Sequence, residues 1–219
     1  EVSAVNGTGI VLPSHFTERK ITDPSTARDA INDVADTLGI VSVEDELGTA
    51  DCSTVLGDTY YSFPQVYRGI PVYGRKVTVS ADADSEAALL TSGFYPIENL
   101  SVEAKITQND AEKIVAGLYP GEADIYVNNL VIFSLDKTNP ELAWKISVHQ
   151  NNSWESVFLS AVDGRALKTF SNELTDNESS SNRFTNVYLY NAENRDIEVD
   201  FRIIFDDGTT AIYDGDDDD

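Results

Sequence analysis

The chain has 219 residues, enough for a sizeable core, and its 41% hydrophobic and 10% aromatic content predicts that most of it folds. Its 38 acidic residues outnumber 15 basic ones, for a formal net charge of −23. Such a surface repels phosphate backbones and anionic lipid, which argues against nucleic acid and membrane surfaces as partners. No stretch approaches the ~18 apolar residues that a membrane helix needs. Cys52 is the single cysteine, so no internal disulfide can form. The chain begins at Glu1 and contains no Met, which is compatible with a removed signal peptide.

Residues 1–20 predict no clear element, and the first one expected is a helix over 24–38. Thr22-Asp23-Pro24 offers an N-cap with proline in the first turn, apolar residues recur at helical spacing, and Gly39 supplies a stop.

A β-meander is expected next. An alternating run over 59–67 is followed by a turn at 68–69, a second run that continues through Val77 and Val79, and a third strand over 87–94. An acidic loop separates the last two strands.

A second unit is expected from about residue 101. Thr107 and Asp110 resemble a capping box at the start of a helix that Pro120-Gly121 ends. The helix carries an apolar face of Ala111, Ile114, Val115 and Leu118. Four strands are predicted after it, over 129–135, 142–149, 156–161 and 166–170. The fold class is therefore α+β: two small units, each with a helix packed on an antiparallel sheet, followed by a β-hairpin tail.

The polar residues 171–183 predict a linker, and the strands expected after them belong to the tail. The divisions expected are 1–100, 101–170, 171–183 and 184–219.

A search for catalytic groups finds none. The only two histidines, His15 and His149, lie far apart in the sequence and cannot make the HExxH pair of a zinc peptidase. No G-x-S-x-G elbow marks a nucleophile, and Cys52 lies outside any thiol-protease signature. Asp82 and Asp84 are interpreted as a solvated acidic loop. The alternating carboxylates of Asp214, Asp216 and Asp218 could bind calcium in a full-length protein.

The run from Gln65 to Gly74, QVYRGIPVYG, resembles the core of the fungalysin/thermolysin propeptide domain. The motif residues, read as structural, are Gln65, Tyr67, Gly69, Pro71, Val72 and Gly74. Residues 101–170 are similar to a PepSY domain, in which the turn at Asp163-Gly164 closes the last hairpin. Together the two resemblances cover roughly residues 20–170.

The resemblance implies the pro-segment of a secreted, thermolysin-like (M4) zinc metallopeptidase. Its partner is then the catalytic domain of the same polypeptide, which it helps to fold and inhibits until autoprocessing. Zinc and calcium are expected in that full-length peptidase, and no cofactor in this chain. Thermolysin-like enzymes prefer a bulky apolar residue after the cut, which makes Glu173–Leu174 and Arg183–Phe184 the candidate processing sites. Residues 184–219 then resemble the start of the mature peptidase domain.

Two other interpretations stay open at this stage. The chain could be a free-standing secreted inhibitor or binding module of the same type, or a calcium-stabilised acidic surface module.

Overall fold

The computed structural model describes residues 3–5, 9–134, 139–151, 153–171, 201–204 and 210–213, the first and the last two ranges as backbone. The chain divides into two units, Glu1–Asn177 and Glu178–Asp219, and each is described by itself. No helix in the described ranges is long and apolar enough to cross a membrane.

The first unit begins with strands and short helices. Strands β1 (Ser3–Val5) and β2 (Gly9–Leu12) precede the helices α1 (Pro24–Asn32), α2 (Ala35–Leu38) and α3 (Val43–Glu46). The predicted helix over 24–38 is therefore two helices. Its N-cap is confirmed, because Asp23 accepts a hydrogen bond from Thr26 N (2.8 Å), and Gly39 caps α2 at φ 73°. The break falls where the Asp33 carboxylate accepts from Thr17 Oγ1 (2.7 Å) and Arg19 Nε (2.7 Å) and where Val34 leaves helical geometry at φ −121°.

The predicted meander is confirmed and gains a strand. It consists of β3 (Asp51–Val55), β4 (Asp58–Tyr67), β5 (Ile70–Ala81) and β6 (Ala87–Ser92). β3 was not predicted, because four of its five residues are exposed and the strand therefore lacks an alternation of buried and exposed positions. A core that includes Ile31, Phe63 and Val79 lies between the helices and this sheet.

The second half of this unit has one helix and four strands. They are α4 (Gln108–Leu118), β7 (Asp124–Phe133), β8 (Glu141–Gln150), β9 (Ser153–Ser160) and β10 (Ala166–Ser171). The predicted start of β7 at residue 129 is wrong, because a register shift between Val127 and Asn129 interrupts the alternation of a longer strand. Of the predicted apolar face of α4, Leu118 does not pack on the core: it is 54% exposed, and Tyr119 packs there.

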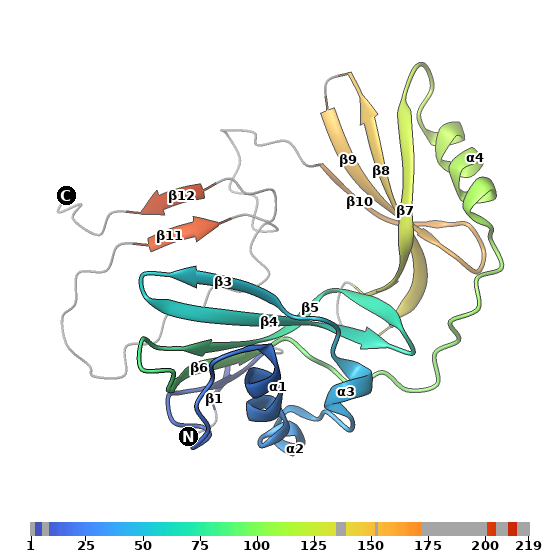
Figure 1. Cartoon of the computed structure of the whole chain (residues 1–219). Helices are drawn as coiled ribbons and strands as arrows, with labels where there is room; N and C mark the ends of the chain where they lie inside the picture. The colour runs from blue at the N-terminus through green and yellow to red at the C-terminus, as the bar shows by residue number, and fades with distance from the viewer. Residues whose placement is uncertain are drawn as a thin grey trace. The chain divides into compact units, whose positions relative to one another are not determined.

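The strands of this unit form one sheet, in the order β1-β2-β6-β5-β7-β8-β9-β10, with β4 pairing β3 and β5 (Figure 1). Its pairs are antiparallel except β5–β7, which run parallel with Val72 opposite Ile132. The expected arrangement of two separate sheets is not confirmed, because this pairing joins them. The fold is mixed α and β with a mostly antiparallel sheet.

In the second unit, strands β11 (Phe201–Ile204) and β12 (Thr210–Tyr213) pair antiparallel.

Candidate functional site

The residues from Gln65 to Gly74 lead from β4 into β5. Gln65 is 2% exposed, and its side-chain amide donates to Tyr95 O (2.7 Å) and accepts from Tyr95 N (3.2 Å). Arg68 and Gly69 form the turn at φ 50° and 79°, and a type I′ hairpin requires positive φ at both positions. The buried amide thus anchors the chain beyond β6 to the end of β4.

Val72 and Tyr73 contact the second half of the sheet. Val72 packs in a buried cluster with Tyr95, Ile97 and Ile132. The ring of Tyr73, which points to the other face as the next residue of a strand, lies 4.5 Å from the ring of Phe158 between centroids. The motif that the sequence singled out therefore lies at the junction of the two halves.

The Asp163-Gly164 turn lies beside α4. Gly164 has φ 76°, and a Cβ there would lie 2.9 Å from Ile114 Cδ1 on that helix. The Asp163 carboxylate accepts from Arg165 N (3.2 Å), and the pKa of Asp163 is lowered chiefly by its hydrogen bond with Ser160 and by that backbone bond. The left-handed backbone favours glycine here, and any larger residue would also displace the end of the Ile114 side chain.

The sheet β7–β10 has one face covered by a helix and one face without. Ala111 and Val115 of α4 pack on the first face, and Figure 1 shows α4 beside these strands. In the described part of the chain, no helix lies over the second face. We call it the open face and define it by six side chains: Tyr73, Tyr126, Lys145, Trp154, Lys168 and Phe170. Strand register and ring contacts place them together, with Phe158 at the centre.

Both lysines of the open face lie over aromatic rings. Lys145 Nζ is 5.4 Å from the ring centroid of Tyr73, and Lys168 Nζ is 5.6 Å from that of Phe170. Neither lysine forms an ion pair with a described carboxylate. Cation–π contacts of this kind contribute about 0.5–1 kcal/mol at exposed sites and leave the ammonium free to meet an anion.

A row of stacked rings continues the open face. Trp154 stacks on His149 (4.7 Å between centroids) and on Tyr126 (5.8 Å), and His149 Nδ1 lies 3.5 Å from Asp124 Oδ2. This row of rings was not predicted from the sequence. The available signal was that His149 and Trp154 flank the turn that begins at Asn151, so that they are cross-strand partners in a hairpin.

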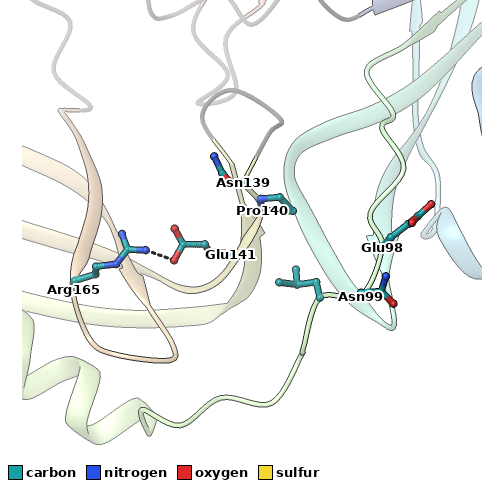
Figure 2. A pocket seen from close by; sticks show the side chains of 7 residues that line it. Glu98, Asn99, Asn139, Pro140, Glu141 and Arg165 are labelled. Atoms are coloured by element: carbon teal, nitrogen blue, oxygen red, sulfur yellow. Dashed lines mark hydrogen bonds and ion pairs between the residues drawn. The ribbon is translucent and has the colours of Figure 1, made fainter.

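A hollow of about 590 Å³ lies between the segment 98–100 and the start of β8 (Figure 2). Arg165 lines it, and its guanidinium bonds the Glu141 carboxylate and lies 3.3 Å from Asp163 Oδ2. The one cation of the lining is thus already neutralised, which leaves the hollow without a free cation to hold an anionic ligand; its other charged residue is Glu98.

The structure brings no catalytic group together among the residues it describes. His15 lies in the turn after β2, His149 on β8, and Cys52 is exposed on β3. The described residues contain no group of three or more His, Cys, Asp or Glu that could hold a metal ion. In the acidic loop, Asp82 Oδ1 accepts from Asp84 N (2.9 Å) and Glu86 N (2.8 Å), so this carboxylate stabilises its own turn.

Several residues singled out in the sequence lie outside the described ranges. They are the candidate calcium ligands Asp214, Asp216 and Asp218, and the candidate processing residues Glu173, Leu174, Arg183 and Phe184.

Comparison with known proteins adds one family match. Residues 52–94 match the model of the Fungalysin/Thermolysin Propeptide Motif. The matched range covers the meander from β3 through β6, and the match supports a propeptide of this type. Among solved structures, the chain is similar to the Bacillus megaterium YpeB C-terminal domain, with 14% identity over 75% of this chain and 71% of that one and a TM-score of 0.38. It is also similar to a putative lipoprotein from Clostridium difficile 630, with 16% identity over 73% and 99% and a TM-score of 0.27. These two likenesses are too weak to carry an argument. No curated protein matches the chain.

Proposed function

We propose that the chain is the pro-segment of a secreted, thermolysin-like zinc metalloendopeptidase. In this proposal it acts as an intramolecular chaperone and inhibitor of the catalytic domain that follows it in the precursor. The match of residues 52–94 to a propeptide motif is the observation that carries the proposal. The helix α4 and the strands β7–β10 take the place of the PepSY-like half.

The proposed mechanism needs a rigid surface and no reactive group. A pro-segment that binds the native-like catalytic domain better than its unfolded states stabilises the former by mass action, and the same contacts block the enzyme after folding. The buried Gln65–Tyr95 pair and the β5–β7 pairing support such a role, because they hold the two halves of the sheet together.

Zinc and calcium belong to the full-length peptidase in this proposal. Asp214, Asp216 and Asp218 are proposed as calcium ligands there, because hard oxygen donors at alternate positions suit that ion. In this proposal the zinc ligands lie in the catalytic domain of the precursor and not in this chain.

Processing is proposed at Glu173–Leu174 or Arg183–Phe184, both beyond the last strand of the first unit. Sequencing the new N-terminus of the activated peptidase tests this assignment. A cut before residue 165 or after residue 190 would contradict it.

The function is tested by refolding the catalytic domain of the precursor with and without the chain. We expect activity to be regained only with the chain present, and to be inhibited by excess chain. Failure to assist folding or to inhibit would overturn the proposal. If the coding sequence stops soon after residue 219, the free-standing inhibitor or binding module is favoured instead. A rise in melting temperature on calcium titration of the chain would favour the calcium-stabilised module.

A further inference from the structure

The open face differs from the rest of the described surface in its exposed aromatic rings. Seven large hydrophobic side chains are exposed in the described residues: Val41, Leu56, Tyr73, Leu118, Tyr126, Trp154 and Val162. The three aromatic ones, exposed by 37% (Tyr73), 51% (Tyr126) and 44% (Trp154), all lie on the open face. Aromatic residues are enriched in binding surfaces, because they bury a large area with little loss of conformational freedom.

The charge of the open face is opposite to that of the chain. Lys145 and Lys168 are cross-strand neighbours of Phe158 on this face. Of the carboxylates next to it, Glu141 is paired with Arg165, and Asp124 lies 3.5 Å from the His149 ring. Glu155 is bonded by Tyr119 on the helix-covered face. The six side chains that define the open face include two lysines and no acid, so this aromatic patch interrupts a strongly acidic surface.

The proposed partner is itself acidic where its sequence is known. Residues 184–219, which the proposed function assigns to the catalytic domain, contain eleven Asp and Glu and two Arg, and residues 1–171 contain 24 acidic and 12 basic residues. Two acidic bodies repel each other unless a cationic area mediates their contact. The open face supplies such an area.

We propose that the open face is the surface on which the pro-segment binds an acidic, partly apolar surface of its catalytic domain, with Lys145 and Lys168 facing carboxylates and Tyr73, Tyr126 and Trp154 covering apolar side chains. This rests on the proposed function and adds to it the side of the sheet that binds and the chemistry of the partner surface.

The test uses the full chain and the activated catalytic domain of the same precursor, and measures the inhibition constant and the association rate. Lys145→Glu/Lys168→Glu reverses both charges of the open face. We expect the inhibition constant to rise on the order of 100-fold at low salt, mainly through slower association, and by less than about 10-fold at 0.5 M salt.

The matched control is Lys105→Glu/Lys113→Glu, which makes the same change of charge on α4 and on the segment before it. We expect this control to bind within about 3-fold of the wild type, since surface charges away from an interface contribute little. Lys145→Gln/Lys168→Gln should lie between the wild type and the reversed variant. Circular dichroism and thermal melting show whether each variant folds, and Trp154→Ala provides a second probe that leaves the charges unchanged.

The outcomes separate the two proposals. If the wild type inhibits, and the open-face and control reversals weaken binding equally, the assigned surface is wrong while the proposed function stands. If the reversed variant and Trp154→Ala both inhibit like the wild type, the assigned surface is also wrong. If the wild type neither binds nor inhibits the catalytic domain, both proposals fail.

Discussion

Replacing Gln65 by leucine tests the role of the propeptide motif in the fold. The change keeps the side-chain volume but removes both hydrogen bonds to the backbone of Tyr95. Each bond contributes about 1 kcal/mol net, and each buried group left without a partner adds a penalty of about 1–3 kcal/mol, which the apolar contact of leucine partly offsets. We expect the free energy of unfolding to fall by about 3 kcal/mol, and the melting temperature by roughly 6–12 °C for a unit of this size.

Urea unfolding followed by tryptophan fluorescence measures the change. Gln108→Leu is the control, because Gln108 donates to Val127 O at 3.4 Å on an exposed surface and should change stability by less than about 0.5 kcal/mol. Gln65→Glu provides a second check: it can still accept from Tyr95 N, but its charge faces Tyr95 O, so its stability should recover as the pH falls and the acid becomes a donor. A loss below about 0.5 kcal/mol for Gln65→Leu, with an unchanged denaturant slope, would refute the reasoning.

Three further predictions concern α4, α3 and the Asp-Gly turn. Gly164→Ala should lower the free energy of unfolding by about 1–3 kcal/mol, because φ is 76° there and the new methyl would displace the end of the Ile114 side chain. Gly117→Ala, which has open space around it in α4, should raise the free energy of unfolding by about 0.5–1 kcal/mol. Equal effects of the two substitutions in urea unfolding would contradict the geometry. Arg28→Met removes hydrogen bonds to three backbone carbonyls, one at the start of α3 and two just after its end. Thermal unfolding should show that the free energy of unfolding falls by about 2–3 kcal/mol. An unchanged free energy of unfolding would show that these hydrogen bonds are dispensable. Burial and the hydrogen bond to Glu155 raise the pKa of Tyr119 from 10.0 to about 12, so this phenol stabilises the fold fully below pH 10 and loses that effect as the pH rises towards 12. The stability advantage of the wild type over Tyr119→Phe, from urea unfolding at several pH values, should shrink over that window; a constant difference would contradict the assignment.

Local sequence signals predicted most of the strands and both main helices. Asp23, Gly39 and Thr107 act through hydrogen bonds within a few residues, so their roles can be inferred from the sequence alone. The alternation of the meander and the turn at Arg68–Gly69 are equally local.

The missed features depend on contacts between distant residues. Nothing near Val72 shows that it pairs with Ile132, so the joining of two expected units into one sheet was not predictable. The open face was missed for the same reason, because Tyr73 meets Phe158 only after the two halves of the sheet join. The break after α1 similarly lies at a contact between residues 14 positions apart, Arg19 and Asp33.

The β5–β7 pairing has a consequence for the order of folding. Its partners lie far apart in the sequence, at residues 72 and 132, whereas the hairpins β4–β5 and β8–β9 pair residues that are close along the chain. Closing a long loop costs more conformational entropy than closing a hairpin, so the two halves should acquire their strands first and join last. Substitutions at Val72 or Ile132 should then speed unfolding more than they slow folding. The open face, which includes Tyr73 from one half and Lys145 from the other, is complete only after this last step, so a partner that requires both would bind only the fully folded pro-segment.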